Sequence, residues 1–107
     1  MSSVQVSVAI AVKDRRDLLA ACLDGLAAQT FRDFEVVVVD NGSTDGTLEL
    51  LRSMADAPAT PFPLTVLTEP GSLGRVRNAG VRAARGDIVA FVDSDCVPAP
   101  DWLERGI

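Results

Sequence analysis

The sequence predicts an α/β fold in which helices cover both faces of a mostly parallel sheet. Apolar runs rich in β-branched residues are typical of buried strands, and other segments carry apolar residues at helical spacing. The two kinds of segment alternate along the chain as βαβαβαβ. This order favours parallel strands joined by right-handed crossovers, and therefore a three-layer α/β/α arrangement that the chain does not complete.

The first half of the chain predicts two strands and a helix between them. Residues 4–12 form a nearly continuous apolar run, as expected of a buried strand. Residues 15–28 carry leucines and Cys22 at helical spacing and predict a helix. The run at 34–39 predicts a second buried strand, which ends at Asp40.

The second half continues the same alternation. A turn at 41–43 should lead into a helix that is capped by Ser43, Thr44 or Asp45. The elements expected are a helix to about Met54, a strand at 64–68, a helix at 73–85, a strand at 88–92 and the start of a helix at 98–106. Gly86 is expected to follow the third helix as its C′ residue. The proline-rich residues 58–63 predict a surface loop.

The composition of the chain is that of one small globular domain and argues against some classes of function. The 107 residues suit one small domain, and 48% of them are hydrophobic, which is enough for a core. Fifteen acidic and ten basic residues give a net charge of −5, and the aromatic residues are only four Phe and one Trp. Nucleic-acid binding, which needs basic surface and stacking platforms, is therefore not expected. The absence of histidine excludes triads that require it.

The cysteines and the hydropathy pattern indicate in which cellular compartment the protein is expected. Cys22 and Cys96 lie far apart and lack the spacing of a metal site. Cys22 falls on the apolar stripe of its helix and should lie in the core. No signal peptide or membrane-length apolar run is visible. We expect a cytoplasmic protein with reduced cysteines, associated with a membrane only through parts outside this chain.

Two carboxylates, Asp93 and Asp95, follow the fourth predicted strand. Side chains two positions apart share one face of a strand, so both acids project the same way if the strand continues through Asp95. Such a pair repels unless a cation lies beside it, and a hard divalent cation fits carboxylate ligands. The alternative is a turn in which one acid caps the following helix.

Polar residues follow three of the strands. Residues 13–14 follow the first strand, 40–43 the second and 93–95 the fourth. Ligands of open α/β sheets bind at the carboxyl ends of the strands. We therefore expect these three strand ends to border one crevice.

Arg77 breaks the pattern of the third helix. Its apolar stripe is formed by Leu73, Val76, Gly80 and Ala84, and its solvated face by Arg75, Asn78, Arg82 and Arg85. Arg77 falls on the apolar side, where a buried guanidinium needs an anion such as a strand-end carboxylate or a bound diphosphate. The alternative is a side chain that packs its stem and reaches water with its charge.

Asp40 also has two interpretations. It either initiates the Asp-Asn-Gly turn or caps the next helix, or it accepts hydrogen bonds from a nucleobase N–H or a ribose hydroxyl. Its position at a strand end favours the second. Lys13 is expected to be a solvated loop residue rather than a phosphate ligand.

Five segments, at residues 6–10, 40–47, 74–80, 83–87 and 91–95, occur in the order of one enzyme family. They include Asp-Asn-Gly-Ser-Thr-Asp-Gly-Thr after the second strand and Phe-Val-Asp-Ser-Asp after the fourth. Together they closely resemble the nucleotide-sugar glycosyltransferases of family 2, which have the Rossmann-like GT-A fold. The resemblance covers nearly the whole chain. Each segment alone is weakly specific, whereas the ordered set is specific.

The resemblance implies a UDP-, GDP- or TDP-sugar donor, Mn²⁺ or Mg²⁺ as cofactor, and inverting transfer of a hexosyl group to an acceptor hydroxyl. By position, Asp40 matches the base-contacting acid of the family, and Arg77 matches its arginine on the nucleotide side. Asp93 matches the first acid of the Asp-x-Asp motif, which lies near the ribose or the metal. Asp95 matches the metal-binding acid of the same motif. The chain reads Ala-Val-Lys-Asp at 11–14, where many members read Pro-Thr-Tyr-Asn. Asp40-Asn41 likewise stands where many have two acids.

In the family, the catalytic base and the acceptor-binding half lie beyond the position of Ile107. Asp101 and Glu104 follow Asp95 but begin a helix, which makes them poor candidates for the base. We therefore expect residues 1–107 to be the N-terminal, nucleotide-sugar-binding part of a GT-A domain. Such a part should bind donor weakly, transfer little or nothing, and self-associate through exposed apolar surface.

Two other classes of protein stay open as alternatives, and so does a purely structural fragment. One is a non-catalytic α/β module that binds a nucleotide or a metal. The other is a phosphoryl-transfer domain of receiver or dehalogenase type, but such domains place a key acid after the first strand. A dinucleotide-binding Rossmann domain is disfavoured because no Gly-x-Gly-x-x-Gly follows the first strand.

Overall fold

Four parallel strands form the centre of the protein in the computed structural model, which describes residues 4–57 and 60–106. The strands are β1 (Val6–Val12), β2 (Phe34–Asp40), β3 (Leu64–Thr68) and β4 (Ile88–Phe91). Their spatial order is β3-β2-β1-β4, and every pair of neighbours is parallel. All four carboxyl ends therefore lie at one edge of the sheet.

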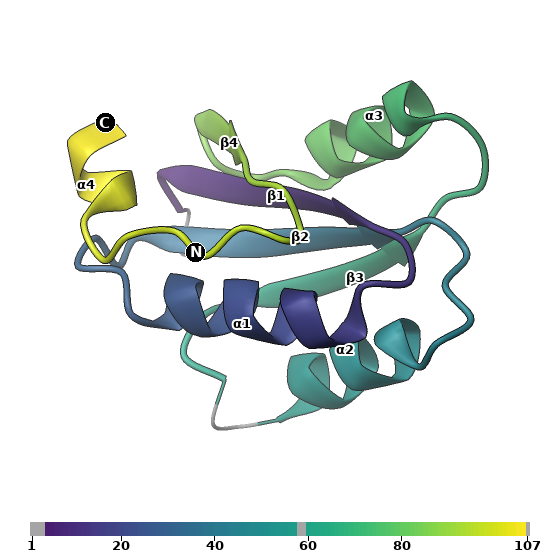
Figure 1. The fold of residues 1–107 in the computed structure, drawn as a ribbon. Coiled ribbons are helices and arrows are strands. Elements are labelled where there is room, and N and C mark those ends of the chain that lie inside the picture. The colour runs from purple at the N-terminus through teal and green to yellow at the C-terminus, as the bar shows by residue number, and fades with distance from the viewer. Residues whose placement is uncertain (1–3, 58–59, 107) are drawn as a thin grey trace.

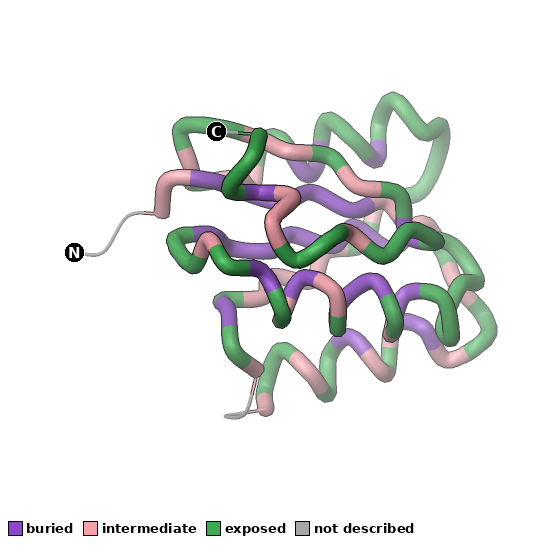
Figure 2. The backbone as a smooth tube through the Cα atoms, turned by 60° about the vertical axis from the view of Figure 1, so that its left-hand side comes forward, coloured by how far each residue is buried: buried purple, intermediate pink, exposed green. Residues whose placement is uncertain are grey.

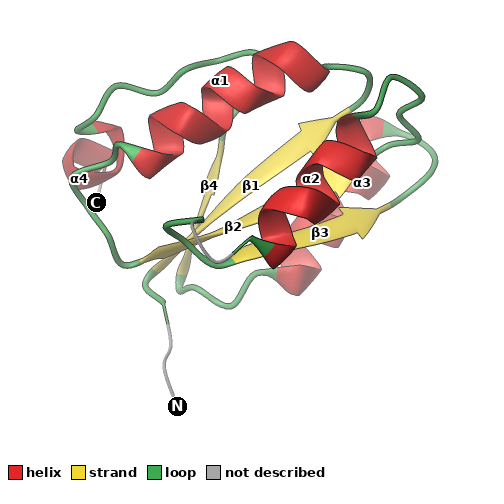
Figure 3. Ribbon diagram, turned by 90° about the horizontal axis from the view of Figure 1, so that it is seen from below, coloured by secondary structure: helices red, strands yellow, loops and turns green. Residues whose placement is uncertain are grey.

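Helices cover both faces of the sheet. They are α1 (Arg16–Ala27), α2 (Thr47–Asp56), α3 (Leu73–Ala83) and the short α4 (Trp102–Gly106). Helices α1 and α2 lie on one face and α3 on the other (Figure 1). Seen from below, α1 and α2 run along the strands (Figure 3). The predicted three-layer α/β/α class is confirmed.

The alternation of side chains along β1 and β2 builds a core on each face. The larger core joins the face of α1 and α2 to Val6, Val8, Ile10, Val12, Phe34, Val36 and Val38. The smaller core, under α3, consists of Val37, Val39, Val76 and Ala79. Both central strands are buried because each has helices above and below it, as Figure 2 shows.

The edge strands are less buried than the sequence predicts. β3 is mostly half-buried, and both ends of β4 are exposed. Ile88 and Phe91 on β4 are 41% and 48% exposed. An edge strand has a neighbour on one side only, which explains the difference. This apolar edge suits self-association, which stays a prediction. None of the described helices is long and apolar enough to cross a membrane.

Several expected helix ends are corrected by the structure. Gly46, in the left-handed region with φ 93°, occupies the N-cap position of α2 instead of one of the three expected residues, although the Asp45 carboxylate accepts the Thr47 N–H at 3.0 Å. α3 ends at Ala83, and α4 begins at Trp102 rather than near residue 98. Gly86 is not a left-handed C′ residue, because its φ is not positive. It is instead pressed against the β1 backbone, where a Cβ would lie 2.8 Å from the Ser7 nitrogen.

A buried carboxylate anchors the start of β4. Glu35, 1% exposed, accepts hydrogen bonds from the Ser7 hydroxyl at 2.6 Å and the Arg85 backbone N–H at 2.7 Å. The Arg85 guanidinium forms an ion pair with it at 3.1 Å, and the Gly86 N–H donates to Ser7 Oγ at 2.8 Å. Arg85 is thus exposed, as expected of a solvated charge, but it also has a specific buried partner that the sequence did not predict. These four residues form the Glu35 clamp, which ties the α3–β4 connection to β1 and β2.

Candidate functional site

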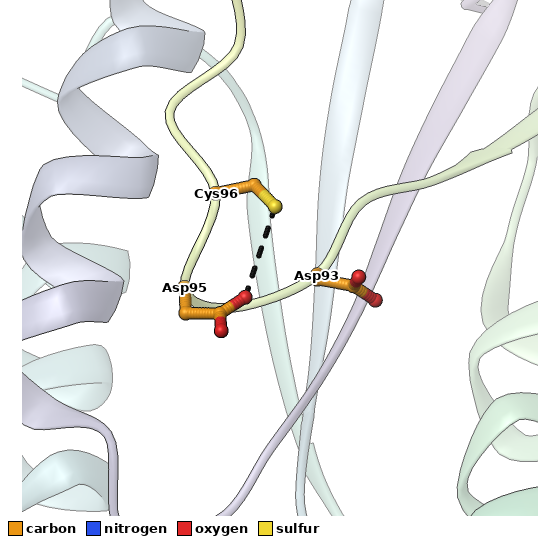
Figure 4. Close-up of side chains that lie close together, drawn as sticks. All are labelled: Asp93, Asp95 and Cys96. Atoms are coloured by element: carbon orange, nitrogen blue, oxygen red, sulfur yellow. Dashed lines mark hydrogen bonds between the residues drawn. The ribbon is translucent and has the colours of Figure 1, made fainter.

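The two acids after β4 lie in a turn, not on the strand. β4 ends at Phe91, and the Cys96 N–H donates to the Asp93 carbonyl at 3.0 Å, which closes a turn through Ser94 and Asp95. The condition that the strand continues through Asp95 is therefore not met. The turn nevertheless gathers the side chains, because ligand atoms of Asp93, Asp95 and Cys96 lie within 4.8 Å of one another (Figure 4). All three residues are exposed.

A hollow of about 240 Å³ adjoins this turn. Its charged lining residues are Arg15, Arg77, Asp93 and Asp95. Arg15 comes from the end of the β1–α1 connection, Arg77 from α3, and the acids from the segment after β4. The predicted meeting of Arg77 with the Asp-x-Asp acids is thus found in the structure, at the carboxyl edge of the sheet.

Arg77 lies at this hollow without being buried. It is exposed, and its guanidinium carbon lies 5.9 Å from the centroid of the Phe91 ring. The predicted burial is wrong because Arg77 lies against Phe91 of the edge strand β4, which is 48% exposed, and the nearby Leu73 is 56% exposed. Stacking on an aromatic face leaves the guanidinium edge available to an anion. Neither Arg77 nor Arg15 forms an ion pair within the described residues.

Asp40 is 1% exposed and bonded to its own turn. One carboxylate oxygen accepts the backbone N–H groups of Gly42 at 3.2 Å and Ser43 at 3.0 Å, and the other accepts the Ser43 hydroxyl. The structure thus shows the turn-forming role that the sequence left as the alternative. A carboxylate has about four acceptor positions, and these three bonds occupy three of them.

Asp40 lines a different hollow from the Asp-x-Asp acids. Its hollow, about 400 Å³, is also bordered by Lys13, Asn41 and Glu69. A third hollow, of about 140 Å³, lies between the two. It shares Lys13 and Asn41 with the hollow of Asp40, and Ala11 and Leu73 with the hollow of Asp93 and Asp95. The expected single crevice is therefore a series of three hollows along the carboxyl edge.

The loops after β1 and β2 are tied together by Asp14, a link that the sequence did not predict. Asp14 has a left-handed φ of 53°. Its N–H donates to Ser43 Oγ at 2.9 Å, and its carboxylate accepts the Thr44 N–H at 2.7 Å. Because Ser43 also donates to Asp40, the turn after β2 holds the chain after β1 in this conformation.

The cysteines converge on the acidic turn from opposite sides. The buried Cys22 thiol donates to the Asp93 carbonyl over 3.8 Å, and the core position predicted for it is confirmed. Burial, reinforced by nearby Cys96 and Asp95, raises the pKa of Cys22 to about 11. Desolvation, followed by the charges of Asp95 and Asp93, also raises the pKa of the exposed Cys96. Both thiols are therefore protonated, poorly reactive groups at neutral pH.

The described geometry matches a known family. The family model described as glycosyl transferase family 2 matches residues 7–107. The chain belongs to glycosyltransferase family 2. Among curated family 2 relatives, glycosyltransferase AglE of Haloferax volcanii is 41% identical over 106 residues, covering 95% of this chain and 34% of AglE. Putative glycosyltransferase EpsH of Bacillus subtilis is 34% identical, covering 98% of this chain and 30% of EpsH.

Solved structures place this family 2 chain in the GT-A fold. S. aureus TarS 1-349 in complex with UDP-GlcNAc superimposes with a TM-score of 0.83 at 33% identity, covering 95% of this chain and 30% of TarS. The mannosyltransferase PcManGT of Pyrobaculum calidifontis, in complex with GDP-Man and Mn²⁺, superimposes with a TM-score of 0.79 at 33% identity. The match covers 94% of this chain and 30% of PcManGT. The predicted GT-A fold is confirmed. The chain spans about a third of the length of AglE and of EpsH.

Proposed function

We propose that this chain supplies the donor-binding part of a glycosyltransferase that transfers a hexosyl group from a nucleoside-diphosphate sugar to an acceptor hydroxyl. The observation that carries the proposal is the hollow in which Arg77 meets Asp93 and Asp95 at the carboxyl edge of the sheet. Similarity to structures that hold UDP-GlcNAc or GDP-Man supports a nucleotide sugar as the ligand.

The residues present fit a hard divalent cation. Asp93 and Asp95 offer exposed carboxylate oxygens within 4.8 Å of each other, and such ligands suit Mg²⁺ and Mn²⁺. Asp95 is the proposed ligand, and Asp93 the acid nearer the ribose or a second ligand. The chemistry that such a cation supplies when bound is neutralisation of charge on the departing diphosphate.

The chain's own residues would hold the donor at its diphosphate and at its nucleoside. The Arg77 guanidinium, stacked on Phe91, is placed to donate hydrogen bonds to phosphate oxygens, and a charge-assisted bond of this kind also restricts their position. Asp40, in its separate hollow, offers its remaining acceptor position to a base N–H or a ribose hydroxyl. The intermediate hollow leaves room for a ligand that extends between them.

The catalytic base is proposed to lie outside this chain. Inverting transfer needs a carboxylate that removes the proton of the acceptor hydroxyl. Glu104 accepts a hydrogen bond from Thr30 at 2.7 Å, and Asp101 pairs with Arg105 at 3.8 Å. Both acids are thus engaged near α4 and line none of the three hollows. Donor binding without efficient transfer is the expected behaviour of the 107-residue chain.

Asp95→Ala tests the metal-dependent part of this proposal. We expect donor affinity in Mn²⁺ to fall by at least about tenfold, because one of two carboxylate ligands is lost. Calorimetric titration with UDP-, GDP- and TDP-sugars, with and without Mn²⁺, measures the effect. Asp87→Ala is the matched control, because it removes an exposed acid that lines none of the three hollows. Metal-independent donor binding that survives Asp95→Ala would favour a non-catalytic nucleotide-binding module instead.

Asp40→Asn separates the turn-forming role of this residue from a contact to the base. The asparagine oxygen can still accept the Gly42 and Ser43 N–H groups, but its NH₂ group replaces the oxygen that accepts the Ser43 hydroxyl, so we expect the melting temperature to fall while the protein stays folded. Nucleotide affinity should fall about tenfold, because an amide NH₂ replaces the carboxylate oxygen whose second acceptor position is proposed to bind the base. Inorganic pyrophosphate, which has no base, should bind the variant and the parent equally. Unchanged nucleotide affinity would leave Asp40 as a turn residue only.

A further inference from the structure

Arg15 lines the hollow of Asp93 and Asp95, although nothing in its sequence pattern distinguishes it from the adjacent Arg16. Both arginines are exposed, and both border a fourth hollow, separate from the three already described, together with Asp45. Only Arg15 also reaches the hollow of the Asp-x-Asp acids. It faces two carboxylates there without forming an ion pair within the described part of the chain.

The backbone before Arg15 is held in an unusual conformation. Asp14 is the single non-glycine residue with positive φ among those described, and the Ser43 and Thr44 bonds keep it there. Such strain persists only where the surroundings enforce it, and it clusters at ligand sites. Here it turns the chain sharply between β1 and α1, immediately before Arg15. The loop after β2 therefore determines where Arg15 lies.

The charges of the hollow balance in a way that indicates a ligand. Asp93 and Asp95 carry two negative charges, and Arg15 and Arg77 carry two positive charges. A divalent cation on the carboxylates would leave the site with two positive charges in excess. A nucleoside-diphosphate sugar carries two negative charges on its phosphates, one on each, and thus matches that excess. With Arg77 alone, one charge of the diphosphate would be uncompensated.

We propose that Arg15 is a second diphosphate-binding residue, which acts opposite Arg77 on the same ligand. This inference rests on the proposed function of the hollow. Two guanidinium groups from different elements would grip a diphosphate from both sides, and each can form paired N–H···O bonds with phosphate oxygens. The site would then favour diphosphates over monophosphates, because a single phosphate cannot satisfy both arginines and the cation together.

Arg15→Gln tests the inference, with Arg16→Gln as the matched control. The probes are inorganic pyrophosphate, UDP and UMP, each titrated by calorimetry in Mn²⁺. We expect Arg15→Gln to weaken pyrophosphate and UDP binding about tenfold and UMP binding much less. Arg16→Gln should bind all three as the parent does. Thermal unfolding of each variant checks that the fold is retained, and Arg15→Lys should recover part of the affinity because it restores the charge.

The outcomes distinguish this inference from the function on which it rests. Equal pyrophosphate affinity in Arg15→Gln and the parent overturns the role of Arg15 and leaves the proposed function intact. Equal losses in Arg15→Gln and Arg16→Gln also overturn it, because a general field effect then explains both. A parent chain that binds neither pyrophosphate nor UDP overturns both proposals. Pyrophosphate binding that needs Arg15, without any preference for a nucleotide, keeps the inference and contradicts the proposed function.

Discussion

Glu35→Gln is expected to lower the free energy of unfolding by about 2–3 kcal/mol. The carboxylate is buried and accepts the Ser7 hydroxyl, the Arg85 N–H and the Arg85 guanidinium. Glutamine keeps one acceptor oxygen but turns an NH₂ group toward these donors. The ion pair itself contributes little, because the Arg85 side chain is 64% exposed and therefore screened by water. The loss comes mainly from the buried hydrogen bonds.

Urea unfolding of parent and variant measures this difference. Glu49→Gln is the control, because Glu49 is an exposed residue in the first turn of α2. We expect it to change stability by less than about 0.5 kcal/mol. A Glu35→Gln variant as stable as this control would show that the Glu35 clamp does not hold β4 in place.

The same residue predicts a dependence of stability on pH. Burial alone would raise the pKa of Glu35, but the bonds from Ser7 and Arg85 together hold it below its usual value of 4.5. A carboxyl with a depressed pKa in the folded state stabilises the protein above its unfolded pKa and loses that contribution as the pH falls through the folded value. The stability difference between the parent and Glu35→Gln should therefore be full above about pH 5 and shrink on further acidification. A difference that does not vary with pH would contradict this assignment.

Gly86→Ala is expected to destabilise the fold by about 3 kcal/mol or more. A Cβ at this position would lie 2.8 Å from the Ser7 nitrogen, 2.8 Å from the Val6 carbonyl carbon and 2.9 Å from the Gln5 oxygen. These are backbone atoms of β1 and of the residue before it, and they cannot move aside as the end of a flexible side chain can. The chain at Gly86 must therefore shift away from β1, which breaks its bond to Ser7 and displaces the start of β4.

Gly74→Ala is the matched control for this substitution. Gly74 lies in the exposed first turn of α3, where the nearest atom to a Cβ would be Ser72 Oγ at 3.8 Å. Alanine should stabilise this helix by about 0.5–1 kcal/mol. Urea unfolding compares the two variants, and equal stability would show that the chain at Gly86 adapts without cost. Because β4 leads into Asp93, we also expect Gly86→Ala to weaken Mn²⁺-dependent donor binding.

The order and type of the elements were predictable from the sequence because the central strands are apolar on both faces. β2 and β3 end where their patterns end, at Asp40 and Thr68, because local hydropathy and burial agree there. The edge strand β4 was predicted one residue too long and too buried. Its apolar residues do not reveal that, among the described residues, β4 pairs with β1 alone and forms an edge of the sheet.

The site was predictable in part, for a reason of topology. Acids that follow parallel strands necessarily lie at one edge of the sheet, so Asp40, Asp93 and Asp95 could be placed there before any coordinates. Arg77 was placed by its break in the helical pattern, although its predicted burial was wrong. Arg15 was missed because an arginine before an amphipathic helix looks like any other surface charge. Its position after the first strand could have drawn attention to residues 15–16, but only the structure separates Arg15 from Arg16.

The sequence by itself determined the α/β class, the strand ends and the family, because these depend on periodicity and on motifs read in order. Only the tertiary structure decided that Asp40 is held inside its own turn, that Asp14 is strained before Arg15, and that Glu35, Ser7, Arg85 and Gly86 form one clamp. Each of these features joins residues about 30 to 80 positions apart, Asp40 excepted, through specific hydrogen bonds. Such bonds depend on how the helices and loops pack around the sheet, which local patterns do not encode.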